Sequence, residues 1–286
     1  MPQPTNYDSI ISALTNSVTS KESNYWFYKN TLTADAQGSP TFYWRATGIP
    51  VVGAVPATGV GTLPTKDTVG AMFLRNATAP DNSYLTTFDM YIDGTVGDYN
   101  SFMLVDVLWF NSGLSGTVIT AQTINSSALT RYTGTNSAGN YLGLVCWTAT
   151  GSTASNVTCS YTNQAGTAGK TTPSVVFWTG AFGAGAIAPT ADQVQILPLA
   201  LGDTGIRSIE SLTLSASTLT AGNFGAMIFR PLATLTQLVT TGMTRDLVLQ
   251  IPSLPQKIND ACLSIITVQS TTSLSKYIGS IKVIEA

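Results

Sequence analysis

Short runs of β-branched and aromatic residues, separated by Gly, Ser and Asn, recur through most of the chain. The most continuous apolar run is SFMLVDVLWF at 101–110. Two further runs, YLGLVCWTAT at 141–150 and NVTCSYTN at 156–163, follow a segment rich in Thr and Ser. Strand-length runs with regularly spaced turn residues are typical of an antiparallel β-sandwich or barrel. We therefore expect a mostly β protein.

More strands are expected on both sides of this central stretch. Runs of strand-like composition occur at 71–77, 83–93, 194–217 and 223–235. In the last of these, Pro231 should mark the edge or the end of a strand, because proline cannot donate to a ladder. Residues 236–286 are expected to end in a strand pair. Residues 46–70, rich in Gly, Pro and Thr, predict a long surface loop.

Only one segment, 5–20, has a helical period. Its apolar stripe predicts a helix over 7–18, with Asn6 or Asp8 as the cap. The stripe consists of Ile10, Ile11, Leu14 and Val18. A helix of about three turns is marginal alone and must dock on something. Docking on its own domain and docking on a neighbouring subunit both remain open.

Aromatic residues are concentrated just after this segment. They are Tyr25, Trp26, Phe27, Tyr28, Phe42, Tyr43 and Trp44. In a strand, alternate side chains face opposite sides, so some of these rings should enter the core and others should reach a second surface. Packing between layers, contact with another subunit and stacking on carbohydrate are the alternatives.

The composition restricts the possible partners. Charged residues make up 10% of the chain, well below the roughly 25% of ordinary soluble proteins. The surface must therefore be covered by Thr, Ser, Asn and Gln, or be partly buried against other subunits. With a net charge of −2 and no Lys/Arg cluster, we expect no nucleic-acid partner. No apolar run has the length of a membrane span, and the first residues lack the layout of a signal peptide, so we expect no membrane partner.

The residues needed for most enzyme chemistry are missing. The chain has no histidine, which excludes Ser-His-Asp and Cys-His catalysis. The segment AGTAGKTT at 165–172 lacks the first glycine of a phosphate loop, and DMYIDGTVGDYN at 89–100 lacks two ligands of a calcium loop. Both are interpreted as turns. The candidate carboxylates for a hydrolase show no pairing beyond chance: Asp89, Asp93, Asp106 and Glu210. We expect no enzyme activity, cofactor or metal.

Three cysteines are too few for a disulfide-built scaffold. If the runs at 141–150 and 156–163 form a hairpin, Cys146 and Cys159 face each other across it. They are then either bonded or, the interpretation we favour, two buried thiols that pack as small hydrophobic side chains.

Five segments carry a resemblance to known proteins. They are LSGTVITAQTINSSALTRYTG at 114–134, YTNQAGTAGKTTP at 161–173, LPLALGDTGIRSIESLTLSAST at 197–218, AGNFGAMIFRPLATL at 221–235 and NYDSIISAL at 6–14. They resemble a group of tailed-bacteriophage virion proteins. The resemblance covers most of residues 5–235 and does not extend to the last fifty. Such proteins are similar in kind to head decoration (cement) proteins, which are often trimeric and often jelly rolls.

The resemblance implies a jelly-roll-like antiparallel β-sandwich at 41–235, with a helical and aromatic arm at 1–40 and a β extension at 236–286. It implies a non-enzymatic cement protein on the outer surface of the capsid, made in the host bacterial cytoplasm. Its partners would be the major capsid protein and further copies of itself, with the apolar stripe and the seven aromatic residues as contacts. The alternative is a receptor- or glycan-binding module of a tail fibre or vertex spike.

Overall fold

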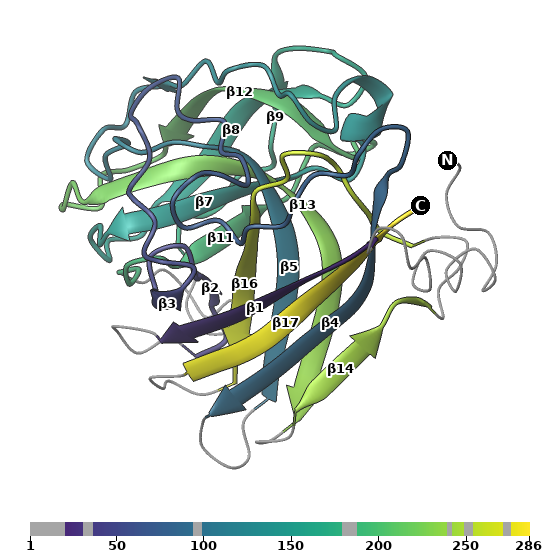
Figure 1. The fold of residues 1–286 in the computed structure, drawn as a ribbon. Helices are drawn as coiled ribbons and strands as arrows, with labels where there is room; N and C mark the ends of the chain where they lie inside the picture. Colours follow the sequence, from purple (N-terminus) through teal and green to yellow (C-terminus); the bar gives the residue numbers. More distant parts are fainter. Residues whose placement is uncertain are drawn as a thin grey trace.

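The computed structural model describes residues 21–30, 37–93, 99–178, 188–238, 242–248, 254–270 and 276–286. These residues form three antiparallel sheets, which confirms the mostly β prediction. Figure 1 shows the sheets stacked in one body. One helical element is described in full, a single 3-10 turn, η1 (Gly134–Ser137). The helix expected at 7–18, with Ile10, Ile11, Leu14 and Val18, lies outside them.

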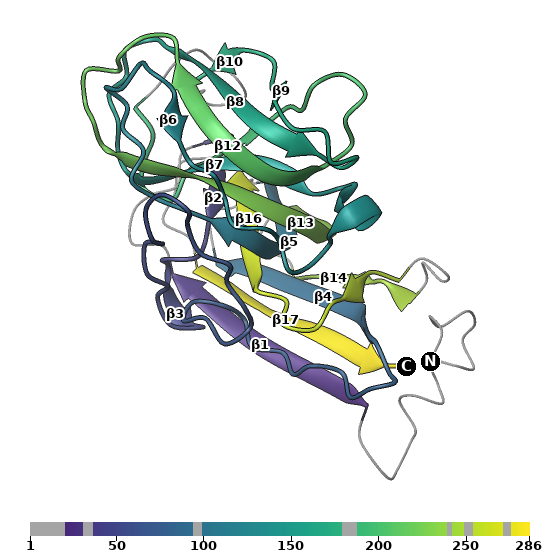
Figure 2. The ribbon, with the colours of Figure 1, turned by 90° about the horizontal axis from the view of Figure 1, so that it is seen from above.

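The sheet drawn lowest in Figure 2, called here the lower sheet, has the strand order β14-β4-β17-β1-β3. Its strands are β1 (Glu22–Asn30), β3 (Thr47–Ile49), β4 (Ser83–Asp93), β14 (Met243–Asp246), β17 (Lys276–Glu285) and, paired with β4 beside this order, β15 (Gln256–Lys257).

The central sheet has the order β11-β7-β13-β5-β16-β2. Its strands are β2 (Pro40–Phe42), β5 (Tyr99–Phe110), β7 (Tyr141–Thr148), β11 (Val194–Leu197), β13 (Asn223–Leu238) and β16 (Leu263–Gln269). This sheet curls until its two edges meet. Thr41 of β2 bridges Gln193, just before β11, and the Phe42 N–H donates to the Asp192 carbonyl at 2.8 Å.

The upper sheet has the order β10-β8-β12-β6, with β9 on β8. Its strands are β6 (Gln122–Thr123), β8 (Asn156–Asn163), β9 (Lys170–Thr171), β10 (Val175–Val176) and β12 (Ile206–Leu214). Figure 2 shows the central sheet between the other two.

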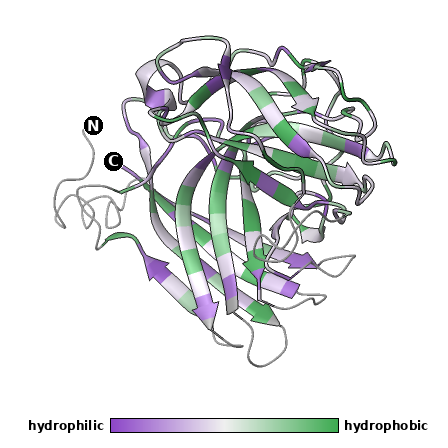
Figure 3. Cartoon of the chain, turned by 180° about the vertical axis from the view of Figure 1, so that it is seen from behind, coloured by the Kyte–Doolittle hydropathy of each residue, from purple (hydrophilic) through white to green (hydrophobic). Residues whose placement is uncertain are grey.

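The central sheet takes part in all three hydrophobic cores, and β13 shows how. Near its start, side chains alternate between two cores. The core shared with the upper sheet holds Phe224, Ala226 and Ile228, and the interior of the curl holds Met227 and Phe229. Near its end, Ala233 and Leu235 pack against the lower sheet. Apolar positions recur along the strands in Figure 3. A strand buried on both faces reads as a continuous apolar run, which explains the sequence at 101–110.

The structure corrects several expectations about single elements. Pro231 lies inside a central strand, at a register shift between Pro231 and Ala233, because a bulge removes the need for its missing N–H. The expected strand at 71–77 is an irregular connection. Its apolar residues Met72 and Leu74 are buried, so their alternation reflects anchoring in the core and not a ladder.

Neighbouring runs in the sequence are also not paired with each other. β4 belongs to the lower sheet and β5 to the central one, and the hairpin of β7 with β8 does not form because these strands lie in different sheets. The expected terminal pair is split in the same way: β16 lies between β5 and β2, and β17 between β4 and β1. The last fifty residues thus supply internal strands to two sheets. The domain boundaries after residues 40 and 235 stay a prediction.

Candidate contact face and cavity

The aromatic side chains on β1 alternate between the buried and the exposed face of this strand. Phe27 is buried in the core against the lower sheet, Tyr25 is half-buried, and Trp26 and Tyr28 face outwards with 66% and 36% of their surface exposed. A strand on the surface of a sandwich must place alternate residues on opposite faces. Of these four neighbours in the sequence, only Trp26 and Tyr28 are therefore available to a partner.

The second aromatic group lies inside the chain. Phe42, Tyr43 and Trp44 are all buried. The rings of Phe42 and Trp44 stack with centroids 6.0 Å apart, and the Trp44 Nε1–H donates to the Ala54 carbonyl at 2.8 Å. Packing between layers is the role that the structure gives these three residues, and we do not carry them into the contact surface.

Sequence reasoning missed a row of exposed apolar residues that crosses the lower sheet. In the strand register, Tyr91 of β4 is opposite Ile278 of β17, Ile278 is opposite Tyr28 of β1, and Tyr28 is opposite Ile49 of β3. Their exposed fractions are 39%, 43%, 36% and 58% in that order. With strands about 4.8 Å apart, the row spans roughly 14 Å. We call these four residues, together with Trp26, the apolar row.

A buried lysine holds one end of this row in place. The Lys29 ammonium donates to the carbonyls of Ala46 and Pro50, at 3.0 and 2.7 Å, on either side of β3. These bonds tie β3, and with it Ile49, to β1. Burial lowers the pKa of Lys29 to about 8, so the group still carries its charge at neutral pH.

The carboxylates considered for hydrolysis are spread over different sheets. Asp89 of β4 accepts a hydrogen bond from Ser280, and Glu210 of β12 accepts one from Thr162, at 2.8 and 2.6 Å. Asp106 of the central sheet is fully buried and paired with Arg131. The Asp93 side chain lies outside the described part. The structure does not bring Asp89, Asp106 and Glu210 together as an acid/base pair.

The three cysteines are free, buried thiols. Cys146 and Cys159 are therefore not bonded to each other, as the favoured interpretation of the sequence expected. Cys146 and Cys159 come from β7 and β8 and pack in the same core, although their strands are not paired. Burial raises the pKa of Cys146 to about 12 and also raises the pKa values of Cys159 and Cys262. Across the described ranges, no cluster of His, Cys, Asp and Glu residues could hold a metal ion.

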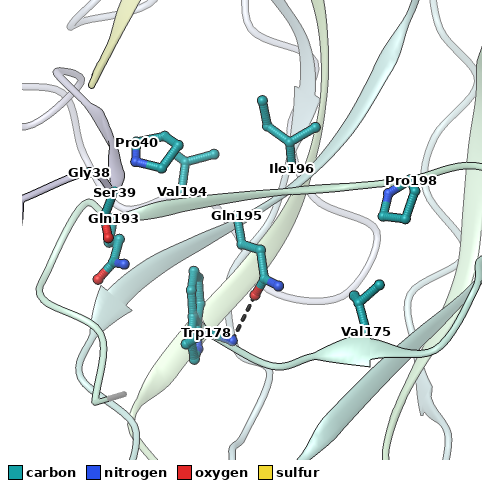
Figure 4. A pocket seen from close by; sticks show the side chains of 10 residues that line it. All are labelled: Gly38, Ser39, Pro40, Val175, Trp178, Gln193, Val194, Gln195, Ile196 and Pro198. Carbon is teal, nitrogen blue, oxygen red and sulfur yellow. Dashed lines mark hydrogen bonds between the residues drawn. The ribbon is translucent and has the colours of Figure 1, made fainter. Parts of the chain in front are cut away.

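A cavity of about 340 Å³ lies beside the seam of the central sheet. We call it the β11 cavity. Its walls are Gly38, Ser39, Pro40, Val175, Trp178, Gln193, Val194, Gln195, Ile196 and Pro198. They come from the residues around β2, from β11 and from the end of β10 (Figure 4). Nothing in the sequence identifies it, because its walls come from three separate segments.

Where the chain is described, no helix is both long and apolar enough to cross a bilayer. No family model matches the sequence, and no curated protein matches it.

Two solved structures align with most of the chain. One is the structure of infectious bursal disease virus Gx strain, at 9% identity and a TM-score of 0.20, covering 93% of this chain and 80% of that one. The other is the infectious bursal disease virus VP2 subviral particle, at 10% identity and a TM-score of 0.20, with the same coverage.

Proposed function

We propose that this chain is a non-enzymatic structural protein of a virus particle, and that it acts as a decoration protein on the head of a tailed phage. It binds the shell through the apolar row of the lower sheet, with its upper sheet turned outwards. The observation that carries the proposal is the row itself, in which five large apolar side chains stand exposed on one face. Exposed apolar residues that gather on one face, and do not occur singly, mark interaction sites.

The rest of the chain supports a structural role. The segments that carry the phage resemblance include all of β12, most of β13 and the end of β8, which are core elements. Only 10% of the residues are charged, which suits a surface partly covered by other subunits. The buried carboxylates and thiols already described are engaged in packing and pairing inside the fold.

The size of the face also suggests how binding is organised. Fully burying one large apolar side chain contributes about 1.5–3 kcal/mol. Because the five residues of the row are about half exposed on average, docking them contributes roughly 5 kcal/mol before the cost of association. Even with no cost of association, the affinity of such a contact would be only on the order of 0.1–1 mM, and the cost weakens it further. Firm attachment therefore needs several linked contacts, which a trimer provides. The stripe of Ile10, Ile11, Leu14 and Val18 is proposed as a further contact in each copy.

The test uses phage particles that lack this protein and the purified full-length chain. The row variant Tyr28→Ser, Tyr91→Ser, Ile278→Thr replaces three exposed side chains by polar ones compatible with strands. A control, Ile119→Ser with Leu201→Ser, removes two apolar residues that are more exposed than the three replaced in the row and belong to no strand of the lower sheet.

We expect the row variant to lose at least about tenfold in particle binding by co-sedimentation, since three docked side chains contribute roughly 3 kcal/mol. The control should bind like the unmodified chain, and both variants should keep its thermal transition within a few degrees. Undiminished binding of a folded row variant would rule out the lower sheet as the contact face.

A further inference from the structure

We infer that a cavity beside Arg230 binds an acidic sugar through the carboxylate of that sugar. The cavity lies where η1, the middle of β13 and the residues around β15 come together, and we call it the Arg230 cavity. Its volume is about 440 Å³, within the range of small-ligand sites. Its walls are Tyr132, Thr135, Asn136, Ala138, Arg230, Pro231, Leu232, Pro255, Gln256 and Ile258. No residue of the apolar row lines it, so the inference is independent of the shell contact.

The first observation is a guanidinium without a carboxylate. Arg230 is partly buried and is the one charged residue in the walls. Asp106 lies opposite Arg230 in the register of β13 and β5, but both of its oxygens are bonded to Arg131. Arg45, Arg75 and Arg131 each form an ion pair with a carboxylate of the chain, whereas Arg230 forms none with the described residues. A partly buried cation in a cavity without a counter-charge favours an anion from outside the chain.

The second observation is that the donors of this guanidinium are free to bind. Nη1 donates to the Ala138 carbonyl, and Nε and Nη2 make no hydrogen bond with the described residues. These two nitrogens are not among the polar atoms sealed inside the fold, so a ligand can reach them. Nε and Nη2 share one edge of the guanidinium. Arg131 uses the same two atoms to hold both oxygens of Asp106, at 3.0 and 2.9 Å, so a carboxylate is the group that this edge fits.

The third observation is that the guanidinium is held in place. Its Cζ lies 5.0 Å from the centre of the Tyr132 ring, and the Tyr132 hydroxyl donates to the Gln256 carbonyl at 3.2 Å. The turn after η1 lies close against Nη1 because residue 139 is glycine, and a Cβ on Gly139 would stand 2.5 Å from that nitrogen. Stacking on the ring leaves the edge of the guanidinium open. The cation is therefore preorganised, which lowers the entropy cost of binding.

The charge and the volume of the cavity select a small monocarboxylate. One guanidinium balances one negative charge, which a carboxylate carries and a phosphate monoester exceeds. A single Asp or Glu side chain of a partner protein would bring the same charge but would leave most of the cavity empty. The structure therefore favours a small molecule over a protein side chain.

The other walls select a hydroxylated ligand body. Thr135, Asn136 and Gln256 are exposed polar residues that line the cavity, so hydroxyl groups of a ligand can bond to them. Pro231 and Leu232 supply apolar surface, on which the C–H face of a sugar ring can pack. A uronic acid combines a carboxylate, hydroxyl groups and such a face.

The experiment follows the Nε–H resonances of the full-length chain labelled with ¹⁵N-arginine. The chain has six arginines, and loss of one resonance in Arg230→Lys assigns the signal of interest. The probes are methyl glucuronide and methyl galacturonide, each titrated to about 20 mM to cover millimolar affinity. Two control ligands separate charge from shape. Methyl glucuronamide keeps the sugar and loses the charge, and cyclohexanecarboxylate keeps the charge and loses the hydroxyl groups.

Two variants separate this site from general attraction of anions. Arg230→Gln removes the proposed contact. Arg245→Gln removes another guanidinium, which is bonded to the Thr234 carbonyl and lies outside the walls of the cavity. Thermal transitions show whether each variant is folded. If Arg230→Gln does not fold, Arg230→Lys takes its place, because it keeps the charge but lacks the planar pair of donors.

We expect at least one uronide to shift the Arg230 resonance saturably, while the resonance of Arg131 stays in place. The amide should bind at least about tenfold more weakly, and cyclohexanecarboxylate several-fold more weakly, than that uronide. Arg230→Gln should lose at least about tenfold in affinity, Arg230→Lys should also bind more weakly, and Arg245→Gln should bind as the unmodified chain does.

Four results would each overturn the inference. They are no shift with either uronide, equal affinity for the amide or for cyclohexanecarboxylate, undiminished binding by a folded Arg230 variant, and an equal loss in Arg245→Gln.

Discussion

Arg131→Met should destabilise the fold by about 3–5 kcal/mol, because it leaves a carboxylate buried without its counter-charge. Arg131 donates from Nε and Nη2 to the two carboxylate oxygens of Asp106, at 3.0 and 2.9 Å. Its Nη2 also donates to the carbonyls of Pro64 and Val107 at 3.0 and 2.9 Å. The exposed fractions of the two side chains are 4% and 0%, so solvent cannot replace these bonds.

After the change, the contact left to the Asp106 carboxylate is the Cys262 N–H, at 2.8 Å from its Oδ1. Burial already raises the pKa of Asp106, and Arg131 opposes that rise. In the variant the pKa of this carboxyl should be higher still. A carboxyl with a folded-state pKa above its unfolded value binds more protons when folded, so the variant loses stability as the pH rises through the acidic range. Its deficit relative to the unmodified chain should therefore be smaller at pH 5 than at pH 7.

Urea unfolding followed by tryptophan fluorescence at pH 5 and pH 7 measures both quantities. The double variant Asp106→Leu, Arg131→Met should recover a large part of the loss, since replacing both members of a buried pair is often close to neutral. A single-variant loss below about 1 kcal/mol, or a deficit that does not change with pH, would refute the view that this ion pair is a desolvated structural element.

Two further predictions concern buried ionisable groups. Lys257 is buried and its Nζ has no hydrogen-bond partner, and burial lowers its pKa from 10.5 to about 8. At pH 7 the folded chain holds Lys257 in its charged form against the cost of burial, so Lys257→Met should be more stable by up to about 3 kcal/mol. Between pH 8 and 10.5 the unfolded chain binds more protons than the folded one, so the unmodified chain gains stability and this advantage should shrink. A gap that stays constant in urea titrations across this range would contradict the prediction. The buried thiols Cys146, Cys159 and Cys262 should not react with a thiol reagent in the native chain and should all react in denaturant, so rapid labelling of any one without unfolding would show that its burial is wrong.

The strands themselves could be predicted well from local pattern. The runs at 101–110, 141–150 and 156–163 became β5, β7 and β8 with small changes at their ends. Their β-branched and aromatic residues favour an extended, buried backbone, and this preference depends only on residues that are neighbours in the sequence. Strand partners could not be predicted, because β17 pairs with β1 from the opposite end of the chain, and no local signal specifies such a contact.

The contact face was partly within reach of sequence reasoning. Alternation along β1 already separates Trp26 and Tyr28 from Phe27 and Lys29. Ile278, Tyr91 and Ile49 could not be joined to them, because the row exists only through the register of four strands. The β11 cavity and the Arg230 cavity were also out of reach, because the walls of each come from three separate segments.

The most direct test of the proposed shell contact is a cryo-EM map of the intact particle with this chain placed in the density. We expect copies at repeated lattice points across the head, with Tyr28, Tyr91 and Ile278 of each copy against the shell. Copies found only at the tail or at vertices, or a lower sheet turned to solvent, would contradict the assignment of the apolar row as the face that binds the capsid.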